Sequence, residues 1–103
     1  MNKETIIRDI KKLNRKYEED GFIIVSLFGS YARDTYDIYS DIDLTYKIDH
    51  NKFFKDDAFA KLAKIEEIKK ELEHMFHKKI DLIPANTTNY LLQETLKAEQ
   101  VSV

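Results

Sequence analysis

One short apolar run limits how this chain can fold. Residues 22–28, Phe-Ile-Ile-Val-Ser-Leu-Phe, are apolar at every position except Ser26, which is typical of a β-strand buried on both faces. Gly29, one of only two glycines in the chain, follows directly and precedes Ser30. Because glycine adopts backbone conformations that other residues avoid, it allows a sharp turn where a strand ends. The sequence therefore predicts a central buried strand followed by a tight Gly-Ser turn.

A second strand, with two carboxylates at its start, is predicted ten residues beyond that turn. Residues 41–47, Asp-Ile-Asp-Leu-Thr-Tyr-Lys, alternate between polar and apolar side chains, as in a strand with one apolar face. Side chains two residues apart point to the same face of a strand, so Asp41 and Asp43 are expected to lie together. Carboxylates this close repel, and each raises the pKa of the other. A magnesium ion, which prefers oxygen ligands, would relieve that repulsion.

Helical periodicity appears on both sides of these strands. Residues 3–19 carry apolar side chains at the spacing of an amphipathic helix, with Asn2 as the expected N-cap and Gly21 as the left-handed stop. Residues 57–77 are predicted to form a second long helix, and residues 48–56 a charged loop before it. The apolar stripe of that second helix is Phe59, Leu62, Ile65, Ile68, Leu72, Met75 and Phe76.

The C-terminal part of the chain adds one strand and one helix to the prediction. Residues 79–83, Lys-Ile-Asp-Leu-Ile, are predicted to form a short strand ended by Pro84, and residues 90–97 a last helix. The resulting order of helix, strand, strand, helix, strand and helix indicates an α/β (α+β) fold with a small mixed β-sheet packed with helices. A length of 103 residues is that of one domain, so residues 1–103 are expected to form a single domain.

Composition excludes several classes of function. The net charge of -2 argues against direct nucleic-acid binding, which normally requires a basic surplus. The absence of cysteine excludes a thiolate metal site. The sequence contains neither an apolar leader nor a stretch of membrane-spanning length. We therefore expect a cytoplasmic location without a membrane partner, and a homo-oligomer is left open.

Each of the polar signals also has an ordinary explanation. The Gly29-Ser30 step suits phosphate oxygens, but it also suits a plain turn at the end of a strand. Asp41 and Asp43 would equally fit a solvated strand end. Asp81 interrupts an apolar strand, where a buried carboxylate needs a cation or a hydrogen-bond partner; the alternative is an edge position facing water, or an ion pair with a nearby lysine or arginine.

The order of these signals resembles the DNA polymerase beta nucleotidyltransferase superfamily, and more closely its bacterial minimal nucleotidyltransferases. The resemblance is carried by residues 27–33, Leu-Phe-Gly-Ser-Tyr-Ala-Arg, by residues 40–44, Ser-Asp-Ile-Asp-Leu, and by residues 79–83. It implies a polymerase-beta-like nucleotidyltransferase fold. One departure is Asp34, because such proteins often have a small residue after the Ala-Arg pair. The insert 34–39 adds two carboxylates and two tyrosines that would lie at the mouth of the site.

The resemblance also implies a role for each residue of the motif. Asp41 and Asp43 would bridge two Mg²⁺ ions, and Asp81 would ligate the catalytic ion and help to deprotonate the acceptor hydroxyl. Gly29 and Ser30 would hold the β- and γ-phosphates of ATP. Arg33 lies one helical turn beyond Gly29, and is expected either to contact phosphate or to pair with Asp34 or Asp37. Other charged and histidine side chains, including Lys78 and Lys79, are interpreted as a solvated surface.

In the minimal family, the resemblance implies an antitoxin that transfers AMP from ATP to a tyrosine hydroxyl of a cognate HEPN-domain ribonuclease toxin. A chain of this length has no room for an added acceptor-binding domain, which is consistent with a protein acceptor. Two alternatives remain: a non-catalytic binding module that masks its partner, and a nucleotidyltransferase that acts on a small molecule.

Overall fold

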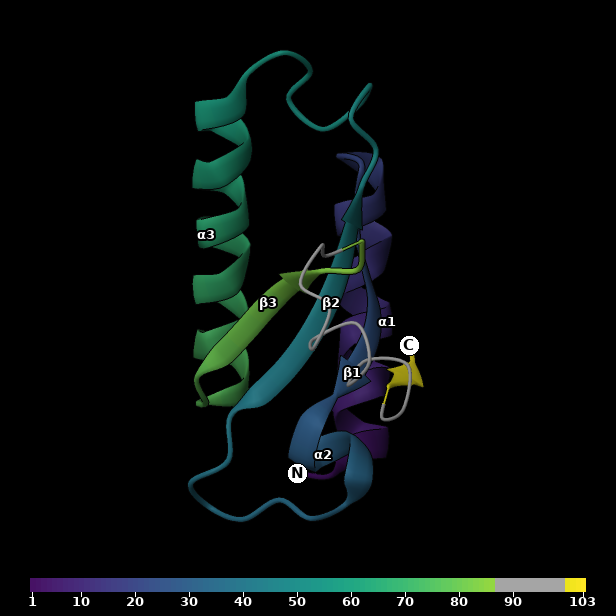
Figure 1. Cartoon of the computed structure of the whole chain (residues 1–103), viewed down its shortest axis with the longest axis vertical. Coiled ribbons are helices and arrows are strands. Elements are labelled where there is room, and N and C mark those ends of the chain that lie inside the picture. The colour runs from purple at the N-terminus through teal and green to yellow at the C-terminus, as the bar shows by residue number, and fades with distance from the viewer. Residues whose placement is uncertain (87–99) are drawn as a thin grey trace.

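The computed structural model describes residues 1–86 and 100–103. Its elements in chain order are α1 (Lys3–Glu19), β1 (Phe22–Phe28), α2 (Gly29–Arg33), β2 (Ile42–Ile48), α3 (Ala58–Phe76), β3 (Ile80–Pro84) and β4 (Val101–Ser102) (Figure 1). The predicted α/β fold is confirmed, with both long helices and the first three strands within one residue of their predicted bounds. The helix predicted over residues 90–97 lies outside the described residues.

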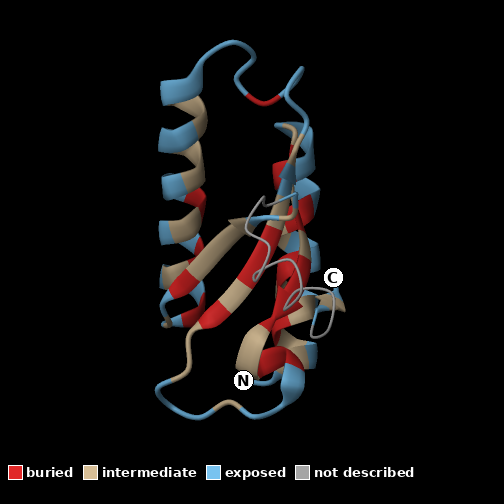
Figure 2. Cartoon of the chain, in the orientation of Figure 1, coloured by how far each residue is buried: buried red, intermediate tan, exposed pale blue. Residues whose placement is uncertain are grey.

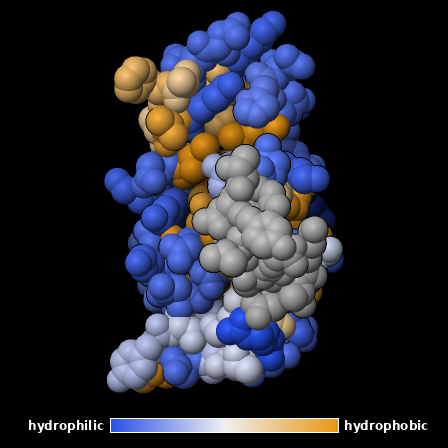
Figure 3. All heavy atoms as spheres, in the orientation of Figure 1, coloured by the Kyte–Doolittle hydropathy of each residue, from blue (hydrophilic) through white to orange (hydrophobic). Residues whose placement is uncertain are grey.

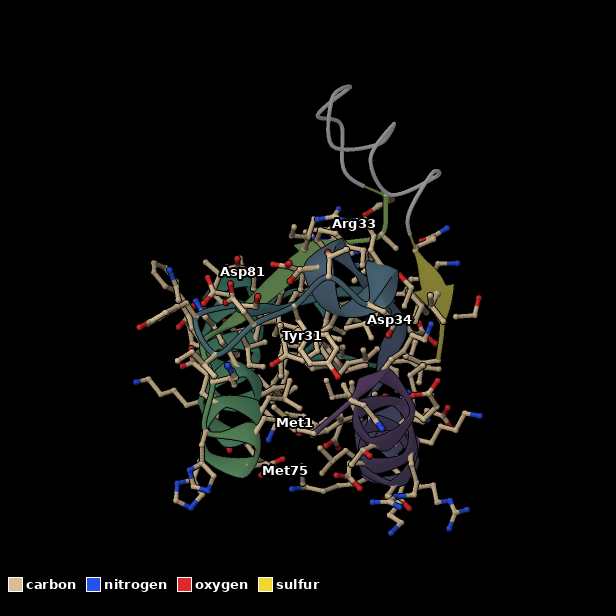
Figure 4. The ribbon with its side chains drawn as sticks, turned by 90° about the horizontal axis from the view of Figure 1, so that it is seen from below. Met1, Tyr31, Arg33, Asp34, Met75 and Asp81 are labelled. Atoms are coloured by element: carbon tan, nitrogen blue, oxygen red, sulfur yellow. The ribbon has the colours of Figure 1, made fainter. Side chains whose placement is uncertain are left out.

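The four strands form one mixed sheet in the order β3-β2-β1-β4. β1 is antiparallel to both β2 and β4, whereas β2 and β3 are parallel. Seen from below, α1 and α3 lie side by side on one face of this sheet (Figure 4). Neither helix, nor any other in the described ranges, is long and apolar enough to cross a membrane.

The hydrophobic core fills the space between the sheet and the two long helices (Figure 2). The strands contribute side chains at alternate positions, and the helices contribute one stripe each. Its fully or almost fully buried members include Ile6, Ile10, Tyr17, Phe22, Ile24, Leu27, Ile42, Leu44, Ile68, Leu72 and Ile80. Because Ile42 and Leu44 point into this core, the side chains that alternate with them in β2 point to the opposite face of the sheet.

Two polar side chains stabilise α1, one at its first turn and one where it packs on the sheet. The Asn2 side chain accepts a hydrogen bond from the Thr5 backbone N–H at 2.9 Å, as expected of an N-cap. Buried Asn14 donates to the Ile24 carbonyl at 2.9 Å and accepts from the Ile24 N–H at 3.0 Å. It therefore satisfies both backbone groups of one β1 residue, just before the irregularity in the β1–β2 pairing between Ile24 and Ser26.

The α3 stripe is only partly buried, which corrects the prediction. Ile68, Leu72 and Phe76 are buried, but Phe59 is 88% exposed and Leu62 is 64% exposed. The reason is length: a helix of 19 residues is about 28 Å long, whereas a strand of five residues covers only about 17 Å. Apolar side chains accordingly gather at the upper end of α3 and in the adjoining space beside the sheet (Figure 3).

Two further features were not predicted. β4 adds a fourth strand that pairs with β1 through Ser26 and Leu27. The charged loop before α3 contains a fully buried anchor, Phe53, whose ring lies 5.7 Å from that of Phe22.

Candidate active site

The pairing of three strands brings the sequence-predicted polar residues to one end of the sheet. Phe28 at the end of β1 lies opposite Asp43 of β2, so Gly29 follows directly beside that carboxylate. Asp43 in turn lies opposite Asp81 of the parallel strand β3. Residues from three separate segments of the sequence therefore meet at one place.

Gly29 has two reasons to be glycine. Its φ angle is +76°, a backbone conformation that side chains disfavour. An added Cβ would also overlap Asp43 Oδ2 and lie 3.2 Å from Asp43 Cγ. The turn thus holds the backbone directly against the carboxylate, as close approach to a metal-bound phosphate would require.

Asp43 has the most strongly perturbed carboxyl group of the site. It is half-buried, and burial, a hydrogen bond to Asp81, and the charges of Asp81 and Asp41 together raise its pKa from the ordinary 3.8 to about 6. Only the positive charge of Arg33 acts in the opposite direction. The carboxyls are therefore crowded enough to share a proton when no cation lies between them.

The donor set fits a hard cation that is completed by its substrate. Within residues 1–86 and 100–103, no three His, Cys, Asp or Glu side chains converge as a ready-made metal cage. Two adjacent carboxylates, Asp43 and Asp81, with a third, Asp41, just before β2, are instead what Mg²⁺ uses when phosphate oxygens supply further ligands.

α2 places Ser30 and Arg33 around this end of the sheet. Ser30 is half-buried, and its carbonyl accepts the Thr35 N–H at 2.9 Å, which closes the single helical turn. Arg33 and Asp81 both lie on the upper side of the sheet, away from α1 and α3 (Figure 4). The positive charge of Arg33 lowers the pKa of Asp43, so the guanidinium acts on that carboxyl; phosphate contact stays a prediction.

The structure explains the departure at Asp34. This residue ends α2 in the left-handed region, with φ at 60° and ψ at 30°. Glycine is favoured in that region, and aspartate is among the few other residues that tolerate it. The Asp34 carboxylate pairs with Lys3 at 3.1 Å. The left-handed backbone at this position therefore explains why a residue with a small penalty there, Asp34, can replace the more usual small residue.

One residue near the site could not be recognised from the sequence. Lys78, interpreted as part of a solvated surface, donates its ammonium to the Ile38 carbonyl at 2.9 Å. The two residues are 40 positions apart, so only the parallel placement of β3 beside β2 brings them together. Lys78 joins the turn before β3 to the loop that precedes Asp41.

Comparison with known proteins gives the family. The sequence model of the polymerase beta nucleotidyltransferase family matches residues 8–103. Among solved structures, a protein assigned as a minimal nucleotidyltransferase has a TM-score of 0.73 and 21% identity, and the match covers 100% of this chain and 97% of that one. No curated protein matches the chain in sequence.

Two toxin–antitoxin structures also share the fold. One contains AMP-PNP and matches with a TM-score of 0.63 at 20% identity, over 99% of this chain and 72% of that one. The other, a mutant of MntA–HpeT with two aspartates replaced by glutamate, matches with a TM-score of 0.59 at 18% identity, over 99% and 71%. These identities show a common fold, and the family model spans nearly the whole chain. The chain therefore belongs to the polymerase beta nucleotidyltransferase family.

Proposed function

We propose that this protein is a metal-dependent adenylyltransferase that transfers AMP from ATP to a hydroxyl group of a partner protein. The observation that carries the proposal is the pairing of Asp43 with Asp81 across β2 and β3, with Gly29 packed against the same carboxylate. Within the toxin–antitoxin class suggested by the resemblance, the acceptor is a tyrosine of a HEPN-domain ribonuclease toxin, and this chain is its antitoxin.

Each residue has a defined task in this proposal. Asp41, Asp43 and Asp81 hold two Mg²⁺ ions, which when bound neutralise the triphosphate and activate the acceptor oxygen. The backbone at Gly29 and the Ser30 hydroxyl hold the β- and γ-phosphates, and Arg33 adds positive charge beside them.

The transfer needs no reactant other than ATP and the acceptor hydroxyl. The acceptor oxygen forms a bond to the α-phosphorus of ATP as the bond from that phosphorus to the bridging oxygen of the β-phosphate breaks. Pyrophosphate leaves, and a carboxylate oxygen of Asp81 accepts the hydroxyl proton. With the Asp43 pKa at about 6, that carboxyl is mainly ionised at neutral pH, so it can act as a metal ligand.

The similar structures support the nucleotide and the class of partner. One toxin–antitoxin structure contains AMP-PNP, an ATP analogue. In the MntA–HpeT mutant, the replaced aspartates are two residues apart, which is the spacing of Asp41 and Asp43. Both observations favour ATP at this carboxylate pair and a toxin as the acceptor.

The test uses the protein encoded by the adjacent open reading frame, here called the neighbour protein. Incubation with this chain, ATP and Mg²⁺ should raise the mass of the neighbour protein by adenylyl units, located by mass spectrometry on a tyrosine. The double variant D41N/D43N should abolish the mass change. The matched control is D20N/D56N, which changes two exposed carboxylates remote from the site.

The same variants separate transfer from masking. Under the proposal, D41N/D43N fails to neutralise the neighbour protein although it remains folded. If it neutralises as well as the native chain and the neighbour protein stays unmodified, the chain is a masking module. Transfer to a small molecule with no change in the neighbour protein would also overturn the proposed acceptor.

A further inference from the structure

We propose that the loop of residues 35–40 is the docking element for the acceptor, that Lys78 holds it in place, and that its partner is a protein surface with an apolar patch beside the acceptor hydroxyl. This inference rests on the proposed function and deepens it. It identifies the part of the chain that chooses the acceptor, as distinct from the carboxylates that perform the transfer.

Three sets of contacts order this loop, although it belongs to no helix or strand. At its tip, the Asp37 carboxylate accepts the Tyr39 N–H at 2.8 Å, and the Ser40 hydroxyl accepts the Asp37 N–H at 2.9 Å. At its base, the rings of Tyr31 and Tyr36 stack with centroids 4.3 Å apart. From outside the loop, the Lys78 ammonium donates to the Ile38 carbonyl at 2.9 Å.

This fixed loop exposes the kind of surface that proteins normally bury. Ile38 is 80% exposed and Tyr39 is 85% exposed. Single exposed apolar residues are common, but here two are adjacent on a loop whose backbone is already ordered. An ordered recognition loop loses little conformational entropy on binding, and amphipathic aromatic residues are favoured anchors in protein interfaces.

The position of the loop connects it to the transfer site. It runs from α2 to the start of β2 across the lower end of the molecule (Figure 1), and Tyr39 precedes Asp41 by two residues. A shallow hollow of about 280 Å³ lies beside it, lined in part by Tyr31, Tyr36, Ile38 and Lys78. Tyr31 lies on the side of the sheet that faces the helices, whereas Asp81 lies on the opposite side (Figure 4). The link from the loop to the carboxylates is therefore the chain itself: a partner seated on Ile38 and Tyr39 contacts the segment that leads directly into Asp41, and the hollow can take one of its apolar side chains.

The charge of this region favours a protein over a nucleic acid. Asp37 and Asp41 flank the exposed pair, whereas Asp34 is paired with Lys3 and the Lys78 ammonium is bound to the Ile38 carbonyl. Residues 35–40 themselves contain no lysine or arginine, and the whole chain carries a net charge of -2. Nucleic-acid affinity depends on neutralisation of phosphates by basic side chains, so the exposed Ile38 and Tyr39 fit an apolar protein patch better than a phosphate backbone.

The experiment measures adenylylation of the neighbour protein by loop variants. The double variant I38S/Y39S should raise KM for the neighbour protein about tenfold or more, the loss expected for removed interface anchors, while kcat is retained. The matched control is F59S, which removes an equally exposed aromatic residue from α3 and should leave KM unchanged. Binding of AMP-PNP with Mg²⁺, measured on every variant, verifies an intact fold.

Lys78 is tested as a positioning residue. K78M should raise KM in the same direction as the double variant, and K78R should restore it, because arginine can still donate to the Ile38 carbonyl. Without any partner, chymotrypsin should cleave after Tyr39 faster in K78M than in K70M, a control at an exposed lysine of α3. Equal cleavage rates would show that Lys78 does not order the loop and would overturn its role.

The outcomes separate this inference from the proposed function. If the native chain does not modify the neighbour protein, the proposed function fails and the inference fails with it. If native chain and I38S/Y39S modify it with equal KM, only the docking loop is overturned. If F59S raises KM more than I38S/Y39S does, the partner docks on α3 and the docking loop is overturned. If AMP is transferred to an added RNA and not to the neighbour protein, the choice of a protein partner is overturned.

Discussion

Both glycines of the chain adopt positive φ angles, but only Gly29 touches the candidate site. We predict that G29A loses transfer activity, because the new Cβ would overlap Asp43 Oδ2 and displace the carboxylate paired with Asp81. The left-handed backbone adds a cost of about 1 kcal/mol. Denaturant unfolding and the adenylylation rate per folded molecule measure the two effects separately.

Gly21 provides the matched control for that substitution. Its φ is +86°, and an added Cβ would lie 3.0 Å from the Phe53 backbone nitrogen, at the end of α1. G21A should therefore lose stability but retain activity per folded molecule. Equal activity in G29A and G21A would mean that the contact between Gly29 and Asp43 has no part in the reaction.

The raised pKa of Asp43 predicts a dependence of stability on pH. The folded chain retains a proton between about pH 4 and pH 6 that the unfolded chain releases, because the pKa of this carboxyl rises from 3.8 to about 6 on folding. Stability without metal should therefore fall as pH rises through this window, and the loss should persist above pH 6.

The variant D43N removes this titration. In EDTA, it should match the native chain near pH 4 and become the more stable protein by pH 7, measured as the free energy of unfolding in urea at each pH. D20N, at an exposed carboxylate remote from the site, should show no such divergence. A constant difference between native chain and D43N across the range would contradict the assigned cause.

Among elements, α1 and β1 are joined by apolar packing and by one buried polar side chain, Asn14. N14A would leave the N–H and carbonyl of Ile24 without their partner, and an unsatisfied buried group costs about 1–3 kcal/mol. We predict destabilisation of that size in chemical unfolding, with activity per folded molecule retained. The control N51A, in an exposed turn, should change stability by less than about 0.5 kcal/mol; a similarly small change in N14A would be incompatible with this role.

Helices and strands whose apolar side chains recur at a regular spacing could be predicted from the sequence. The 3.6-residue period gave both long helices, and the alternation in residues 41–47 gave β2, because those patterns reflect burial on one side. β4 has only two residues and no such pattern, so it depends on pairing with β1. The exposed end of α3 was misjudged because its apolar spacing continues beyond the strand that could cover it.

At the scale of the whole molecule, the site depends on register. Asp41 and Asp43 could be placed on one face from sequence, but the meeting with Asp81 requires β3 to pair with β2 in the observed alignment. A shift of one residue would turn Asp81 toward the helices. Burial of Ile80 and Ile42 prevents that shift, so the core fixes the carboxylates on the open face. The sequence pattern predicts which side chains of each strand face the core, but it does not predict how neighbouring strands align with one another.

The assembled site predicts that nucleotide and metal stabilise the protein together. Crowded carboxylates at this end of the sheet repel a triphosphate, so AMP-PNP alone in EDTA should leave the melting temperature almost unchanged. With Mg²⁺ present, ligand at one hundred times its Kd should add about 2.7 kcal/mol of stability, which is a rise of about 10 °C or more for a chain of this size. D41N/D43N should lose most of that rise, whereas D20N/D56N should keep it. Equal stabilisation by AMP-PNP with and without Mg²⁺ would show that the carboxylates do not bind the nucleotide through a cation, and the metal-dependent mechanism would have to be abandoned.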